Sequence, residues 1–128
     1  MTPTELIEDI SHDHAEISEA VESLRALLDA GDYGEARSLL VRLEQIEIRH
    51  YATEEALMRA VAYDRADVHR AEHAEMLDTL ARINQTLALE PAASISPRIL
   101  AHLEAALAHM IQADQKLGRF VAERAAKS

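Results

Sequence analysis

Apolar residues recur every three or four positions along most of the chain, which is the period of an amphipathic α-helix. The first such stripe comprises Ile10, His14, Ile17, Val21, Leu24 and Leu28. Thr2, Pro3 and Glu5 supply a capping hydroxyl, a first-turn proline and a capping-box glutamate, and Gly31 is a typical C-terminal cap. The pattern therefore predicts a helix from Thr2 to just before Gly31, with a histidine inside its apolar stripe.

A second stripe begins after Asp32, a candidate N-cap with Glu35 three residues later. It comprises Leu39, Leu43, Ile46, His50, Leu57 and Val61. A short turn over residues 63–65, with Asp64 as the cap, leads to the third stripe. That stripe comprises His69, His73, Met76, Leu80, Ile83 and Leu87. Both helices thus place histidines at positions that usually hold apolar residues.

The fourth helix is expected to begin at Ser96 and Pro97, after a long connection over residues 90–96 that contains Pro91. Its stripe comprises Ile99, Leu103, Ala106, Met110, Leu117 and Val121. His109 and Asp114 lie beside that stripe. Four helices with short connections predict an all-α, up-down-up-down antiparallel four-helix bundle, and 128 residues fit a single domain over residues 1–128.

Composition excludes several kinds of partner. The net charge of −10 would repel a phosphate backbone, so nucleic acid is not expected as a partner. The chain begins without a targeting segment and contains no apolar run long enough to span a membrane, which predicts a cytoplasmic protein. With no cysteine, a metal would have to bind His, Asp or Glu. No long apolar seam is evident on the polar faces, which favours a monomer.

The histidines and two carboxylates together indicate a metal centre. On a helix, residues four apart share a face, so His50 with Glu54 and His69 with His73 could each approach one ion. The complete set of candidate metal ligands is His14, His50, Glu54, His69, His73, His109 and Asp114. Burying these groups without a cation would cost several kcal/mol for each unpaired charge, about the penalty typical of buried ions. Two octahedral divalent ions would remain short of full coordination, which leaves a position for a small molecule.

The same residues resemble the hemerythrin family over nearly the whole chain. Residues 50–58, with the sequence HYATEEALM, are similar to the family pattern His-Phe-x-x-Glu-Glu-x-x-Met. His69-x-x-x-His73 and His109-x-x-x-x-Asp114 resemble its later motifs, and His14-Ala15-Glu16-Ile17 resembles its opening motif. The resemblance implies two iron ions (Fe2+/Fe3+) with an oxo or hydroxo bridge as the cofactor.

The resemblance also implies a role for each candidate ligand. His69, His73 and His109 would hold one iron, His14 and His50 the other, and Glu54 and Asp114 would bridge the two. The iron with fewer protein ligands would bind dioxygen reversibly, reducing it to hydroperoxide as both irons become ferric. The expected function is an oxygen carrier, store or delivery protein rather than an enzyme, with an oxygen-consuming enzyme as a candidate recipient.

The sequence departs from the family pattern at two positions near the expected site. Tyr51 stands where the family usually has Phe, and Ala105 where it usually has Trp. The phenol could donate a hydrogen bond to bound peroxide or face outward, and Ala105 would leave space for solvent. Faster autoxidation than in a storage protein is therefore a hypothesis. Candidate walls of the oxygen pocket are Ile17, Tyr51, Met110 and Leu117, for which ordinary packing is the favoured interpretation.

Other polar residues are expected to lie outside the site. His12 competes with His14 because Asp9 precedes it at the family's spacing, but the apolar stripe favours His14. His102 is expected to have a polar or surface role, and Asp13 and Glu55 to lie on the solvated face.

Other functions compete with oxygen transport. A di-iron oxidase or ferroxidase of the ferritin-like type uses two Glu-x-x-His motifs, and only the one from Glu47 to His50 is present. Peroxidase reactivity at a hemerythrin-type site is a separate alternative. An oxygen, redox or iron sensor would use the same ligands, but the chain shows no linker to an output domain, which favours a free-standing carrier.

Overall fold

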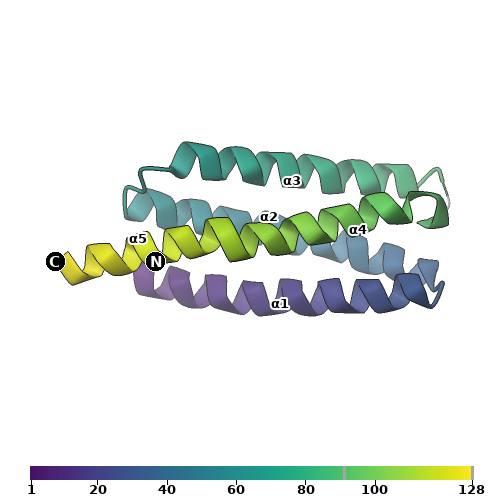
Figure 1. Cartoon of the computed structure of the whole chain (residues 1–128), viewed down its shortest axis with the longest axis horizontal. Helices are drawn as coiled ribbons and strands as arrows, with labels where there is room; N and C mark the ends of the chain where they lie inside the picture. Colours follow the sequence, from purple (N-terminus) through teal and green to yellow (C-terminus); the bar gives the residue numbers. More distant parts are fainter. Residues whose placement is uncertain (91, 128) are drawn as a thin grey trace.

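The computed structural model describes residues 1–90 and 92–127, and within them the chain is almost entirely helical with no strand. The elements are α1 (Pro3–Asp29), α2 (Tyr33–Ala60), α3 (Ala66–Leu87), α4 (Ala92–His109), η1 (Met110–Asp114) and α5 (Gln115–Lys127). Elements α4, η1 and α5 follow one another without a break and form one long fourth helix (Figure 1). The prediction of an all-α four-helix bundle is confirmed.

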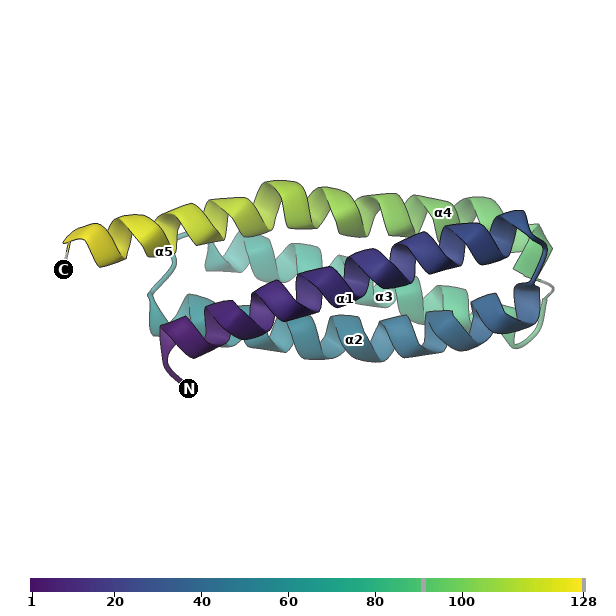
Figure 2. The ribbon, with the colours of Figure 1, turned by 90° about the horizontal axis from the view of Figure 1, so that it is seen from below.

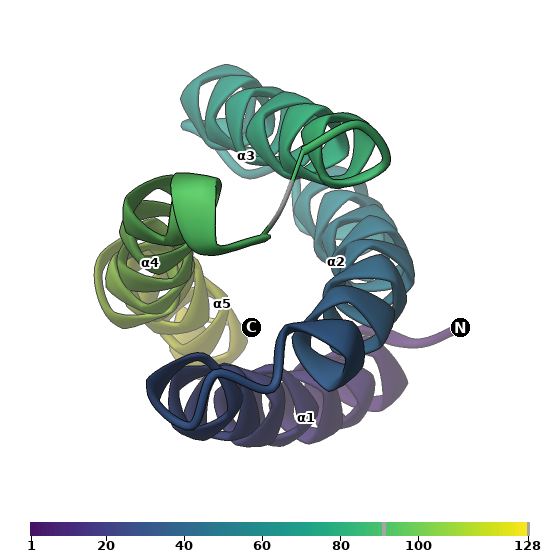
Figure 3. The same cartoon turned by 90° about the vertical axis from the view of Figure 1, so that its right-hand side faces the viewer.

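Consecutive helices run in opposite directions along the length of the molecule (Figure 1). Viewed from the end, they surround a common axis, with α1 beside α2 and α3 beside α4 (Figure 3). The C-terminal part of the long fourth helix extends beyond the start of α1 (Figure 2). Because residues far apart in sequence meet around this axis, each helix can direct side chains to the same level of the bundle.

The helix ends follow the sequence at two of the positions that were expected to cap them. Thr2 accepts a hydrogen bond from the Glu5 backbone, and Asp32 accepts one from the Glu35 backbone. The prediction of Asp64 as a cap was wrong, because α3 has Arg65 at its N-cap position and no side chain caps it. The preceding turn instead places Ala62 in the left-handed region, with φ of 51°.

The expected start of the fourth helix was also wrong. Helix α4 begins at Ala92, so Pro97 lies inside it rather than at its first turn. Proline lacks the backbone N–H that would bond four residues back, so its presence weakens the second turn without ending the helix there. The expected connection over residues 90–96 is correspondingly shorter, and its Pro91 lies outside the described residues.

The core is divided along the bundle into two main apolar clusters. One lies toward the Gly31 end and includes Leu24, Leu40, Leu80 and Leu103. The other lies toward the N-terminus and includes Leu6, Leu57, Met58, Tyr63 and Leu117. The buried polar residues occupy the level between them, with apolar packing on both sides along the bundle.

Candidate metal centre

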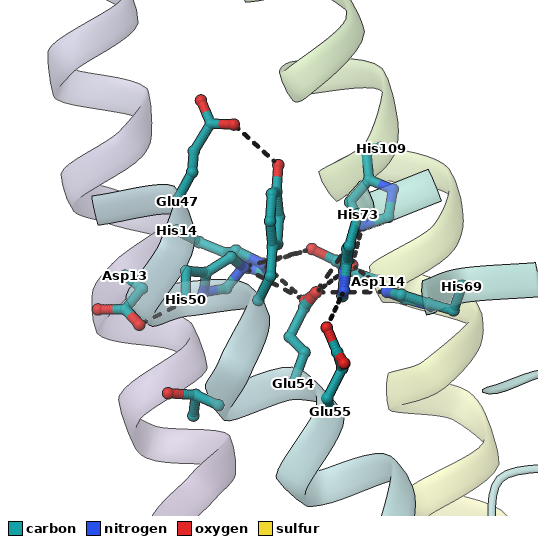
Figure 4. A network of polar contacts seen from close by, with 12 residues as sticks. Asp13, His14, Glu47, His50, Glu54, Glu55, His69, His73, His109 and Asp114 are labelled. Carbon is teal, nitrogen blue, oxygen red and sulfur yellow. Dashed lines mark hydrogen bonds and ion pairs between the residues drawn. The ribbon is translucent and has the colours of Figure 1, made fainter. Parts of the chain in front are cut away.

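Seven side chains from all four helices of the bundle converge on one buried level. They are His14 of α1, His50 and Glu54 of α2, His69 and His73 of α3, His109 of α4 and Asp114 of η1. Figure 4 shows them pointing toward one another, with the two carboxylates between the histidines. The structure thus brings together the whole predicted set, and His12, which is exposed, is not among them.

The seven side chains form two adjoining groups. One contains Glu54, His69, His73, His109 and Asp114, and the other contains His14, His50, Glu54 and Asp114. In each group, one potential ligand atom per residue lies within 4.8 Å of all the others. Glu54 and Asp114 belong to both, which leaves three histidines on one side and two on the other.

The distances show how tightly the imidazoles approach the shared carboxylates. His73 Nε2 is 2.8 Å from one Glu54 oxygen, and His14 Nε2 is 2.7 Å from one Asp114 oxygen. His69 Nε2 lies 3.3 Å from Glu54 and 3.2 Å from Asp114, so this nitrogen faces both carboxylates. His109 Nε2 is 3.1 Å from Asp114. All these nitrogens are the ring atoms farthest from the backbone, which leaves each Nδ1 for other partners.

A π-helical turn brings Asp114 into the group. On a regular α-helix, His109 and Asp114 would point about 140° apart, because five residues at about 100° each overshoot one turn. Element η1 replaces that stretch with the wider i→i+5 hydrogen-bond pattern, which brings residues five apart nearly into line. The five-residue spacing was the signal in the sequence, but the π-helical turn itself was not predicted.

The two shared carboxylates keep their charge in spite of burial. Burial alone would raise the pKa of Glu54 and of Asp114, but close pairing with His109, His14, His50 and His69 holds both well below their usual range. Burial opposes charging His50 and His69, but Asp114 and Glu54 outweigh it and raise the pKa of each to about 9. The pKa of His109 rises to about 10 for the same reasons. A cation at this position would therefore replace protons.

Unsatisfied polar atoms test whether the residues fit a metal. Among the described residues, five buried side-chain polar atoms make no hydrogen bond of acceptable geometry, even where an ion-pair partner is as near as Asp114 Oδ1 is to His109 Nε2. Four of them belong to the two groups: His50 Nε2, Glu54 Oε2, His109 Nε2 and Asp114 Oδ1. Buried polar atoms normally have a partner, and an ion is one explanation for such orphans. Imidazole nitrogens and carboxylate oxygens are also the donors that suit non-haem iron, so the site fits a pair of such ions.

Three of the histidines are held from behind by further carboxylates. His50 Nδ1 lies 3.4 Å from Asp13, His73 Nδ1 3.2 Å from Glu55, and His109 Nδ1 2.9 Å from Glu72. Such partners fix the ring orientation and leave Nε2 for the metal. The expectation that Asp13 and Glu55 belong to the solvated face was wrong: Asp13 is buried and Glu55 is half-buried.

Glu72 was missed by sequence reasoning. It lies three residues after His69, outside the apolar stripe, and its side chain is 46% exposed. The only signal was that a carboxylate one turn from a histidine can contact an imidazole on a neighbouring helix.

A second buried polar group lies beside the site. Tyr51 is buried and donates its hydroxyl hydrogen to Glu47 Oε1 at 3.3 Å, so the phenol does not face outward. Burial, with the charge of Glu47 nearby, raises the pKa of this phenol. His102 Nε2 lies 3.0 Å from the other Glu47 oxygen. Of the two roles expected for His102, polar or surface, the structure shows the polar one, in a buried position.

Glu47 belongs to neither ligand group. In Figure 4 its carboxylate points away from Glu54 and Asp114, although Glu47 and His50 have the spacing of a Glu-x-x-His motif. The glutamate of this motif therefore supplies no ligand, although its histidine, His50, belongs to one of the two groups. Of the expected pocket walls, Ile17, Tyr51 and Leu117 are buried core residues and Met110 is half-buried.

A groove of about 600 Å³ opens between α3 and α4 and reaches the site. Its lining includes His69, His109 and His102, together with Ala105 and other alanines of the fourth helix. Ala105 is exposed in this groove, as its small side chain predicts. One side of the metal centre thus has a route toward solvent that a large residue at position 105 would narrow.

The fold and the site together define a four-helix protein with two adjoining groups of histidines and carboxylates that could bind metal ions. The family profile described as Hemerythrin HHE cation binding domain matches residues 5–119. The chain therefore belongs to the hemerythrin family. No curated protein and no solved structure matches the chain. No helix in the described part of the chain combines the length and apolar character that a membrane crossing requires.

Proposed function

We propose that this protein binds two iron ions and, through them, binds dioxygen reversibly as a carrier, store or delivery protein. The observation that carries the proposal is the pair of ligand groups that share Glu54 and Asp114 but have unequal numbers of histidines. His69, His73 and His109 would hold one iron, and His14 and His50 the other. Fewer protein ligands on the second iron leave it room for a small molecule.

The chemistry at the site divides between the ions and the chain. When bound, the iron pair supplies the electrons that dioxygen accepts. Glu54 and Asp114 would balance the charge of both ions, while Asp13, Glu55 and Glu72 would orient the imidazoles from behind. Buried Ile17 and Leu117, on the two sides of this level, limit the access of water and protons that would release peroxide.

Anaerobic reconstitution with Fe(II) tests the proposal. We expect about two irons per chain, and a visible charge-transfer band that appears with dioxygen and disappears when the gas is purged. Irreversible conversion to a stable diferric spectrum would favour a sensor or an oxidase instead. Failure to retain two irons would contradict the metal assignment itself.

The α3/α4 groove leads to a prediction about autoxidation. Replacing Ala105 by Trp should fill part of the groove beside His109 and slow solvent access, so the oxygenated form should decay several-fold more slowly. Replacing Ala52, which is exposed outside the groove, by Trp is a matched control. Decay is followed by the loss of the visible band in air. Equal decay rates in A105W and the parent would show that the groove is not the route by which solvent enters.

A further inference from the structure

Tyr51 joins the metal centre to the buried polar group beside it. Its ring stacks on the His73 ring, with the centroids 4.1 Å apart and the planes 13° from parallel. Its hydroxyl lies against Glu47 Oε1 at 3.3 Å. One end of this side chain therefore touches a candidate iron ligand and the other touches a carboxylate that belongs to neither ligand group.

The carboxylate is well placed to accept a proton. Glu47 is fully buried, and its second oxygen is paired with His102, whose side chain is 1% exposed. A proton that arrives on Glu47 would remain next to a hydrogen-bonded imidazole rather than escape into apolar surroundings. His102 in turn is one of the residues that line the α3/α4 groove.

Tyr63 provides a natural comparison within the same chain. It is also buried and lies near a candidate ligand, with its ring centroid 6.3 Å from that of His69. Within the described residues, however, its hydroxyl makes no hydrogen bond to a carboxylate. Tyr63 and Tyr51 therefore differ in two features that matter for oxidation of a phenol: Tyr51 stacks on a ligand ring whereas Tyr63 meets one edge-on, and only Tyr51 has a base for its proton.

We infer that Tyr51 is a one-electron donor to the metal centre and that Glu47 accepts its proton. This inference rests on the proposed iron pair. An electron leaves the phenol across the stacked His73 ring, the Tyr51 O–H bond breaks, and an O–H bond forms on Glu47. The products are a neutral tyrosyl radical and a protonated Glu47 that stays paired with His102.

The donor matters when the iron pair alone is one electron short. Reduction of hydrogen peroxide to two water molecules takes two electrons and two protons. When the bound metal centre can supply only one of these electrons, Tyr51 would supply the other, and solvent would supply both protons. The chain contains neither Trp nor Cys, so these easily oxidised side chains cannot compete for the radical.

The test uses iron-loaded protein brought to the mixed-valence state and mixed with hydrogen peroxide, then frozen and examined by electron paramagnetic resonance. We expect an organic radical in the parent and in Y63F, and none in Y51F. In E47Q the radical should form about a hundredfold more slowly, the typical effect of removing a general base. Ring-deuterated tyrosine should narrow the signal, which identifies tyrosine even if E47Q does not fold.

The outcomes separate this inference from the proposed function. Iron content and the reversible oxygen band are measured first on the same samples. Failure to bind iron would overturn both proposals, whereas loss of the reversible oxygen band alone would overturn only the proposed function. If iron binds and oxygen binds reversibly, but no radical forms or Y51F retains it, Tyr51 is not the donor. An unchanged rate in folded E47Q would overturn the role of Glu47. Oxidation of Met76, whose sulfur lies 3.6 Å from the Tyr51 hydroxyl, in place of a radical would likewise overturn the inference.

Discussion

Asp13 shows how much of a metal centre depends on residues that never touch the metal. It is buried on α1, with one oxygen 2.9 Å from Arg49 and the other 3.4 Å from His50 Nδ1. Arg49 thus holds one Asp13 oxygen while the other lies beside His50 Nδ1, an arrangement that orients the imidazole so that Nε2 faces the candidate metal centre. The orientation of a candidate ligand on α2 is therefore set from α1.

Replacing Asp13 by Asn should weaken metal binding while keeping the size of the side chain. We expect iron or cobalt to bind about 10- to 100-fold more weakly, the usual effect of losing such an outer partner. Asp9→Asn, at an exposed position on the same helix, is the control and should bind as the parent does. Competition with a chelator measures the affinity. Identical affinities in D13N and D9N would show that Asp13 does not act through His50.

Sequence reasoning found the converging residues more readily than their outer partners. His14, His50, His69 and His73 interrupt apolar stripes, and a polar residue in such a stripe is conspicuous. Asp13, Glu55 and Glu72 lie outside those stripes, where acidic residues are ordinary on a chain with 23 of them. Their contacts cross between helices, so they depend on the relative rotation of two helices, which the stripe of one helix does not define.

The π-helical turn η1 is the element on which the carboxylate set depends. The period of the apolar stripe predicted the four helices of the bundle, because 3.6-residue repeats determine which face is buried. It could not predict η1, since one wider turn leaves the stripes on either side intact and only changes their relative rotation. The apolar stripe also did not predict the start of α4. Pro97 suggested that the helix begins there, but the helix already begins at Ala92.

Deleting Ile111 should convert η1 into a regular α-helix and leave His109 and Asp114 four residues apart, a spacing that still places both on one face. Ile111 is 61% exposed, so the deletion removes little packing of its own. We expect the deletion variant to retain about two irons per chain, because the regular helix keeps α4 and α5 in nearly the same relative rotation. The substitution Ile111→Ala is the control. Iron analysis and thermal unfolding provide the readouts, and loss of iron from the deletion variant alone would contradict the interpretation of η1 as a turn that accommodates the five-residue spacing.

At the scale of the whole molecule, the metal-free chain should show a distinctive dependence of stability on pH. The folded-state pKa values of His50 and His69 are about 9 and that of His109 about 10. The pKa of an unfolded histidine is about 6.5. Between about pH 6.5 and 10, the folded chain therefore binds more protons than the unfolded chain. This stabilisation is complete below about pH 6.5 and is lost as the pH rises through about 9 to 10.

The carboxylates of Glu54 and Asp114 change the stability of the folded chain with pH in the opposite direction. The folded-state pKa values of Glu54 and Asp114 are lowered. The two carboxylates therefore stabilise the folded chain above their unfolded pKa of about 4, and this stabilisation is lost as the pH falls further. Metal-free protein should therefore be most stable between about pH 4.5 and 6.5. Urea unfolding across the range measures this. A flat profile from about pH 5 to 10 would contradict the proposed pairing of imidazolium and carboxylate groups.

The ligand set spans the chain from His14 to Asp114, and the structure draws it from each helix of the bundle. Two iron ions bound there would act as a cross-link between helices. They would close a loop of 100 residues in a chain that has no cysteine for a disulfide. Iron loading would then govern the lifetime of the protein as well as its ability to bind oxygen. In a cell short of iron, the unlinked chain would open more often and be degraded first, so the abundance of the protein would follow the iron supply without any dedicated regulator.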